Sequence, residues 1–213
     1  MNENNENWIA IKRSMNESGR KINFYENENP RAETIIKWAK IDPSLNEDLY
    51  EVVMNADGII VDDWIHVLGH GSGDNGLSVF MLENLPDGDI MKNSLVVAVD
   101  VLGGLFAICR DKNAEEYGDI LYLQPEYLEW VNAEMGYSEF LLWVSNDDID
   151  TFYTDVRWDK WRELSGRVGL DAAISFDPPI WMEDCDISAS SREIVSFKQL
   201  LEAELLEYVK SSE

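Results

Sequence analysis

The sequence predicts an α+β fold, in which helices flank a twisted and mostly antiparallel sheet. Apolar residues recur at helical spacing over about residues 29–58, and the alternation of extended chain then runs to about residue 125. Helical spacing returns from residue 137. Several extended runs in close succession, joined by short turns, are typical of antiparallel strands. No internal repeat or long linker is visible, which favours one domain.

Two helices are predicted between residue 29 and the first strand. In residues 29–41, Asn29 can cap and Pro30 suits the first turn, and one face carries Ala32, Ile35, Ile36 and Ala39. In residues 42–58, Ser44 and Glu47 form a capping-box pattern, and Gly58 is expected to end the helix.

Four extended runs follow, at residues 59–69, 76–84, 93–109 and 118–125. The third run, "NSLVVAVDVLGGLFAIC", is the most apolar part of the chain. It is too short to span a bilayer, and Asp100 interrupts it. No capped helix follows its glycine pair, so it does not match a dinucleotide-binding turn. We therefore predict two strands joined by a bend at Gly103 and Gly104, where glycine permits positive φ or close backbone approach.

The remainder is predicted to be mainly helical. Residues 137–164 keep helical spacing, and residues 172–181 form one further extended piece that ends at the proline pair. The last element, residues 196–209, is an amphipathic helix with a capping box formed by Ser196 and Gln199.

The predicted domain boundary falls near residue 28. Residues 1–28 are rich in Asn and Glu and are interpreted as a polar N-terminal extension, with one short helix that carries Trp8, Ile11 and Met15 on one side. Residues 29–213 are interpreted as a single α+β domain that ends in the amphipathic helix.

Charge is the most pronounced property of the composition. The 213 residues carry a formal net charge of −25, and residues 41–156 hold 24 acidic side chains against three basic ones. Such a surface repels nucleic acid and anionic lipid, and it attracts basic proteins by long-range steering. The alternative is that the acidity serves only solubility.

The sequence favours a cytoplasmic location. The polar residues 1–21 contain no apolar run typical of a secretory signal, and the two cysteines lie far apart, at Cys109 and Cys185. Two isolated thiols are typical of a reducing compartment. No membrane association is expected.

No coherent catalytic set emerges from the sequence. The segment "HVLGHGSGDNG" holds both histidines, but it matches neither a nucleophile elbow nor a phosphate-binding loop. His66 and His70 can ligate a metal only if a turn brings them together with a residue such as Asp74. A glycine-rich connection between strands is the simpler interpretation. We therefore predict no enzyme activity, no cofactor and no metal.

The order of several segments resembles the bacterial family of uncharacterised proteins called DUF2625. The resemblance runs from about residue 30 to about residue 195 through "GIIVDDWIHVLGHGSG", "SLVVAVDVLGGLFAIC", "GDILYLQPEYLEW", "GYSEFLLW" and "FYTDVRWDKWREL". The family's usual "LGSG" appears here as "LGHGSG", which leaves the role of that turn open.

A weaker resemblance links these segments to the SUKH superfamily, whose glycine-rich strands precede a helix like "YSEFLLWV". This resemblance implies a SUKH-like α+β fold and, because many members are immunity proteins, neutralisation of a bacterial toxin such as a nuclease. A nuclease presents a basic cleft that an acidic protein can cover.

We therefore expect a non-catalytic module that binds a basic protein. The acids in the predicted bends are expected to form the contact surface: Asp62, Asp63, Asp74, Glu83, Asp87 and Asp89. Two alternatives remain open, namely an enzyme or metal protein that uses His66, His70 and Asp74, and a general scaffold protein. The sequence does not define an oligomeric state.

Overall fold

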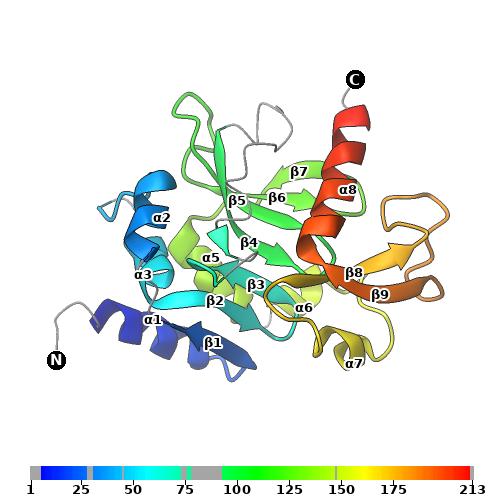
Figure 1. The fold of residues 1–213 in the computed structure, drawn as a ribbon, viewed down its shortest axis with the longest axis horizontal. Coiled ribbons are helices and arrows are strands. Elements are labelled where there is room, and N and C mark those ends of the chain that lie inside the picture. Colours follow the sequence, from blue (N-terminus) through cyan, green and yellow to red (C-terminus); the bar gives the residue numbers. More distant parts are fainter. Residues whose placement is uncertain are drawn as a thin grey trace.

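The computed structural model describes residues 6–27, 31–44, 46–72, 76–77, 93–146 and 148–211. Its centre is an antiparallel seven-stranded sheet in which the strand order follows the chain order, from β1 to β7 (Figure 1). The strands are β1 (Ile22–Glu26), β2 (Ala56–Val61), β3 (Ile65–Leu68), β4 (Ser94–Asp100), β5 (Leu105–Cys109), β6 (Ile120–Gln124) and β7 (Glu129–Asn132). A separate antiparallel pair consists of β8 (Ala172–Asp177) and β9 (Ser191–Ser196). The predicted α+β class is confirmed.

Helices cover the sheet on both sides. In the described residues they are α1 (Glu6–Asn16), α2 (Ala32–Trp38), α3 (Glu47–Asn55), α5 (Tyr137–Val144), α6 (Asp148–Phe152), α7 (Trp161–Ser165) and α8 (Phe197–Ser211). α1 packs on α3 and α5, whereas α8 packs on β8 and β9. In Figure 1, α8 crosses the near face of the sheet and α5 lies behind it. Among the described residues, no helix is both long and apolar enough to cross a bilayer.

The prediction of an N-terminal extension outside the domain is wrong. The apolar side chains of α1, namely Trp8, Ile11 and Met15, are buried in the main core. β1 pairs with β2 as an edge strand of the main sheet. The Trp8 indole also donates a 2.7 Å hydrogen bond to Glu26. Residues 6–26 are therefore part of the domain, because three apolar side chains on one helix face suffice to dock it.

The helix before β2 is confirmed but its predicted ends are not. α3 begins at Glu47, and the Ser44 hydroxyl bonds Asp42 at 2.7 Å instead of capping the helix. The helix ends at Asn55, and Gly58 lies within β2. Local hydrogen bonding within residues 42–44 has thus replaced the expected capping box.

The predicted helical region 137–164 is divided into α5, α6 and α7. After α5, the Ser145 hydroxyl bonds the Leu141 carbonyl at 2.8 Å. Another break falls after α6, where the Thr154 hydroxyl bonds the Asp150 carbonyl at 2.8 Å. Side chains that compete for backbone groups favour such interruptions.

The other predicted elements fare better. The strand-bend-strand unit at residues 93–109 is confirmed as the β4–β5 hairpin. α8 is confirmed, and the Ser196 hydroxyl accepts a 3.2 Å hydrogen bond from the Gln199 amide. Most of the predicted strand 76–84 lies outside the described residues.

Candidate functional site

Asp62 does not lie on an open contact surface as predicted. It follows β2 in a turn, but it is only 6% exposed. Its Oδ2 atom lies 3.1 Å from Arg20 and 2.9 Å from Arg162, and Arg157 is 3.7 Å away. Asp62 thus neutralises arginines that join three segments of the chain, and this position must be removed from the predicted surface.

The other predicted contact residues divide into two groups. Asp63 is half-buried, and the Lys21 ammonium group lies 2.8 Å from its carboxylate. The remaining four lie outside the described residues: Asp74, Glu83, Asp87 and Asp89. Their role stays a prediction.

The two histidines occupy separate environments. His66 in β3 is fully buried, and neither ring nitrogen has a hydrogen-bond partner. Burial lowers the pKa of His66 to about 4, so its ring is neutral at pH 7. The Nδ1 atom of His70 lies 3.1 Å from Asp57. In the described part of the chain, no cluster of three or more His, Cys, Asp or Glu side chains is arranged to hold a metal.

The Gly103–Gly104 bend is built around the buried carboxylate of Asp100. Its Oδ1 atom accepts hydrogen bonds from the amides of Leu102 and Gly104, at 2.8 and 2.9 Å. Its Oδ2 atom accepts hydrogen bonds from the hydroxyls of Tyr122 and Tyr153, at 2.7 and 3.0 Å. One side chain therefore fixes the hairpin turn and ties it to β6 and to the segment after α6.

Both glycines of the bend are required by this geometry. Gly103 has a φ of +105°, which other residues adopt only with strain. A Cβ atom on Gly104 would lie 2.6 Å from the Tyr122 ring. The structural role predicted for the pair is consistent with these contacts.

Two further acids approach the same bend. Glu204 of α8 is 1% exposed, and its carboxylate occupies the space next to Gly103. Burial raises the pKa of Glu204 well above its usual range, and Asp100 and Glu126 raise it further. Burial also raises the pKa values of Asp100 and Glu126.

This buried carboxyl cluster favours a structural role over a catalytic one. All four hydrogen bonds to Asp100 are donated by backbone amides and tyrosine hydroxyls of the same chain. A raised pKa keeps Glu204 protonated, and therefore neutral, at pH values where an ordinary glutamate is charged. No sequence pattern predicts this cluster, because Asp100 and Glu204 are 104 positions apart and acids are frequent throughout the chain.

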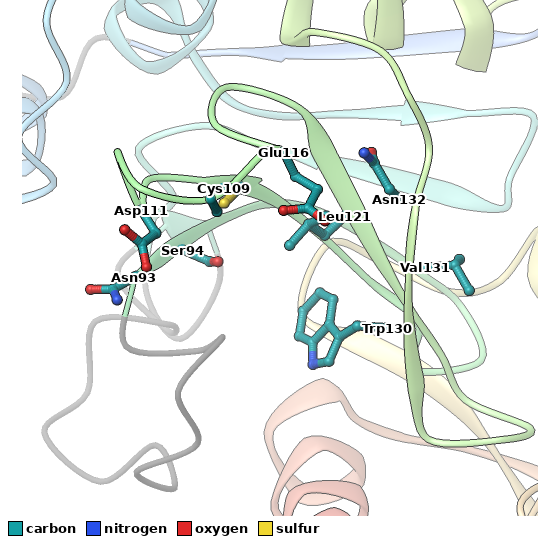
Figure 2. A pocket seen from close by; sticks show the side chains of 10 residues that line it. Asn93, Ser94, Cys109, Asp111, Glu116, Leu121, Trp130, Val131 and Asn132 are labelled. Carbon is teal, nitrogen blue, oxygen red and sulfur yellow. The ribbon is translucent and has the colours of Figure 1, made fainter.

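A more accessible site lies on the sheet next to β7. A cavity of about 460 Å³ is lined by residues at the start of β4, the end of β5, the β5–β6 connection, β6 and β7. Figure 2 shows the Trp130 indole pointing into it beside Leu121, whereas Val131 points away. Asp111 and Glu116 supply two carboxylates, and none of the described lining residues is basic. The combination of an aromatic ring and carboxylates suits a cationic group.

The strand that borders this cavity is an open edge of the sheet. β7 is the last strand in the described sheet order, so one side of its backbone has no neighbouring strand there. Tyr127 is 68% exposed just before it, and Val131 is 38% exposed within it. Open edges of this kind can accept a further strand from another chain. β7 was not predicted from the sequence, because Pro125 and the surrounding acids conceal its alternation.

The charge around this edge is of one sign. Residues 113–156, which include β6, β7, α5 and α6, contain eleven acidic side chains and no basic one. Asp150 is paired with Arg20 at 2.9 Å, but Glu129, Glu134 and Glu139 are exposed. The edge is therefore hydrophobic at Tyr127 and Val131 and acidic around them.

Comparisons with known proteins identify the family. The model of the family described as "Protein of unknown function DUF2625" matches residues 1–200. The chain is 38% identical over 109 residues to "Putative uncharacterized protein YbfG" of Escherichia coli (strain K12). The aligned residues make up 51% of this chain and 50% of that protein. It is 29% identical over 146 residues to an "Uncharacterized protein" of Haemophilus influenzae. Here the aligned residues make up 67% of this chain and 64% of that protein. The chain thus spans between half and two thirds of these relatives, and the family model includes the N-terminal region that packs into the core. The chain belongs to the DUF2625 family.

Proposed function

We propose that the protein is a non-catalytic binding module that docks a basic protein at the β7 edge. The observation that carries the proposal is the open edge strand within a 44-residue segment that has eleven acids and no basic residue. The negative electrostatic field of these acids accelerates association with a cationic protein, and it disfavours the binding of nucleic acid and anionic lipid.

The cavity beside β7 gives the partner a specific anchor. A lysine or arginine side chain inserted there contacts the Trp130 ring and faces Asp111 and Glu116. A strand of the partner laid along β7 adds backbone hydrogen bonds, and Tyr127 and Val131 supply apolar contact. The contact surface is thus shifted from the predicted turn at Asp62 to the opposite end of the sheet order.

Within this proposal, the partner is a toxin of basic surface, such as a nuclease, and the protein acts as an immunity protein in the cytoplasm. The support is the SUKH resemblance of the sequence together with the acid-only edge. Coverage of a nuclease cleft by this face blocks the enzyme without chemistry by the binder.

The test combines capture with kinetics. Immobilised protein is incubated with lysate of the source cell at low and at high ionic strength, and a retained basic protein is then purified. We expect the triple variant Asp111→Lys/Glu116→Lys/Glu129→Lys to slow its association about tenfold at low salt, because these charges steer the encounter. The measurement is the association rate constant by surface plasmon resonance.

A matched control separates this site from general acidity. Glu115 is exposed and adjacent in sequence to Glu116, but it does not line the cavity. Glu116→Gln is expected to weaken binding about fivefold, whereas Glu115→Gln is expected to have little effect, because only the first faces the inserted cation. Equal effects of the two variants, or binding that does not depend on salt, would falsify the proposed docking site. If the purified partner is an active nuclease, its inhibition by the wild-type protein tests the immunity role directly.

A further inference from the structure

A second cavity, of about 880 Å³, lies where the N-terminal ends of α3 and α5 meet the β5–β6 connection. Backbone hydrogen bonds place its walls side by side. The Gly118 amide bonds the Cys109 carbonyl at 2.9 Å, and the Ile120 amide bonds the Met135 carbonyl at 2.8 Å. Arg110, Gly118 and Gly136 therefore border one cavity, which meets the β7 cavity at Asn93, Ser94 and Cys109.

Three of the chain's 17 Lys and Arg side chains line this cavity, namely Lys40, Arg110 and Lys112. Arg110 is partly buried, and burial lowers its pKa. None of the three forms an ion pair within the described residues, in contrast to Lys12, Lys21 and Arg162. A partly buried guanidinium with no carboxylate partner in the described part of the chain is unexpected when the sequence holds 42 acids.

The acids of the same cavity are mostly engaged in local hydrogen bonds. Asp42 accepts hydrogen bonds from the amide and hydroxyl of Ser44, at 2.9 and 2.7 Å. Glu139 accepts a 3.1 Å hydrogen bond from the Gly136 amide. Asp48 is the exception among the lining acids, and its charge helps to raise the pKa of Tyr137. The lining holds four acids and three cations, and the cations are the side chains that an anion would contact.

Tyr137 forms a buried part of the cavity wall. It lines the cavity and is 5% exposed, and its buried hydroxyl has no hydrogen-bond partner among the described residues. Burial raises the pKa of this phenol, so the group remains a donor. An unsatisfied buried hydroxyl costs free energy unless a partner reaches it.

The first turn of α5 adds further donors. The initial amides of a helix have no partner within the helix, and the helix dipole favours negative charge there. The position of a Cβ on Gly136 has no atom within 4 Å, so a ligand can approach this backbone closely. α3, whose first turn also lines the cavity, has no side-chain cap.

From these observations we propose that the cavity binds the phosphate group of a small phosphate monoester. Arg110 and Lys112 neutralise its charge, and the first turn of α5 and the Ser138 hydroxyl donate to its oxygens. A phosphate group, with its larger charge and three free oxygens, uses these donors more fully than a carboxylate. The volume leaves room for the organic part of the ligand.

The test uses phenyl phosphate and benzoate as matched probes, titrated into the full-length protein by calorimetry at low ionic strength. Phenyl phosphate is expected to bind in a saturable way and at least about tenfold more tightly than benzoate. Arg110→Gln is expected to weaken phenyl phosphate binding about tenfold. Arg167→Gln, an exposed arginine outside the cavity, is the matched control and should bind as the wild type does.

Because Arg110 is partly buried and its replacement can affect the fold, a variant at an exposed residue provides a second test of binding. Lys112 is exposed, and Lys112→Gln is expected to weaken binding about threefold without loss of fold. Circular dichroism verifies the fold of every variant. The proposal is overturned if benzoate binds as tightly as phenyl phosphate, if no saturation occurs, or if Arg110→Gln and Arg167→Gln bind alike. These outcomes leave the β7 docking site untouched, since its test uses different residues and a protein partner.

Discussion

The carboxylate of Asp62 accepts a 2.9 Å hydrogen bond from the guanidinium of Arg162, one hundred positions later in the chain. Arg20, from the segment between α1 and β1, reaches the same carboxylate and also bonds Asp150 at 2.9 Å. Arg157 lies 3.7 Å from the same carboxylate and packs on Trp64 and on Trp161, with its guanidinium 4.9 and 4.2 Å from the ring centroids. A single acid thereby holds the N-terminal region and the α6–α7 region against the β2–β3 turn.

Replacement of this acid should destabilise the protein. Asp62→Asn keeps the shape of the side chain but leaves Arg20 and Arg157 short of a countercharge, which is expected to lower the free energy of unfolding by about 3 kcal/mol. Urea denaturation measures the change. Asp159→Asn, at an exposed position, is the control and should change stability by less than about 0.5 kcal/mol. Equal stability of the two variants would contradict the role of Asp62.

The buried carboxyl of Glu204 should make stability fall as pH rises. Its pKa is raised in the folded protein, so the folded state binds more protons than the unfolded state above the ordinary value of about 4.3. Stability is therefore greatest below that value and declines up to the folded pKa. Glu204→Gln should reduce this decline and stabilise the protein at neutral pH. The measurement is the urea midpoint between pH 4 and pH 8, with Glu202→Gln as an exposed control on the same helix.

The glycine bend should not tolerate a side chain. Gly104→Ala forces its new methyl group against the Tyr122 ring and the Asp100 carboxylate, which is expected to cost about 2–3 kcal/mol of unfolding free energy. Gly136→Ala, which meets no atom within 4 Å, should change stability by less than about 0.5 kcal/mol. Thermal denaturation of the two variants distinguishes them. A mild effect of Gly104→Ala would show that the hairpin relaxes around the added group.

The N-terminal helix should contribute to the stability of the whole domain. Trp8 is 1% exposed and packs edge-on against Phe24, with 5.8 Å between ring centroids. Trp8→Ala is expected to lower the free energy of unfolding by about 3–5 kcal/mol. Ile9→Ala, at a neighbouring position that is 46% exposed, should have little effect. If α1 were a separate appendage, both variants would unfold at the wild-type denaturant concentration.

Sequence reasoning succeeded where the determining signal is local. The β4–β5 hairpin follows from alternating apolar residues and a glycine pair, and α8 follows from helical spacing behind Ser196. It failed where short strands are polar and show no alternation of their own. The four residues of β7 include one acid, and β9 is equally polar, so neither carries a clear strand pattern.

In the candidate sites too, the features that depend on residues far apart in the sequence were not predicted. Asp62 has the local features of an exposed turn residue, and only arginines 42 and 100 positions away make it a buried ion-pair partner. The polar composition of residues 1–28 suggested an extension, although the spacing of Trp8, Ile11 and Met15 already marked the face that is buried. Both proposed cavities combine residues from separate strands and loops, which no single segment of sequence indicates.

The sequential order of the main sheet has a consequence for how the molecule assembles. From β2 to β7, each strand pairs with the one synthesised just before it, so a nascent chain can extend a finished edge without inserting a strand between two earlier ones. Tyr153 and Glu204 arrive last, after the hairpin that bears Asp100 is complete. Water therefore solvates that carboxylate until the final third of the polypeptide closes over it, and dehydration of the acid cluster is expected to be a late event in folding.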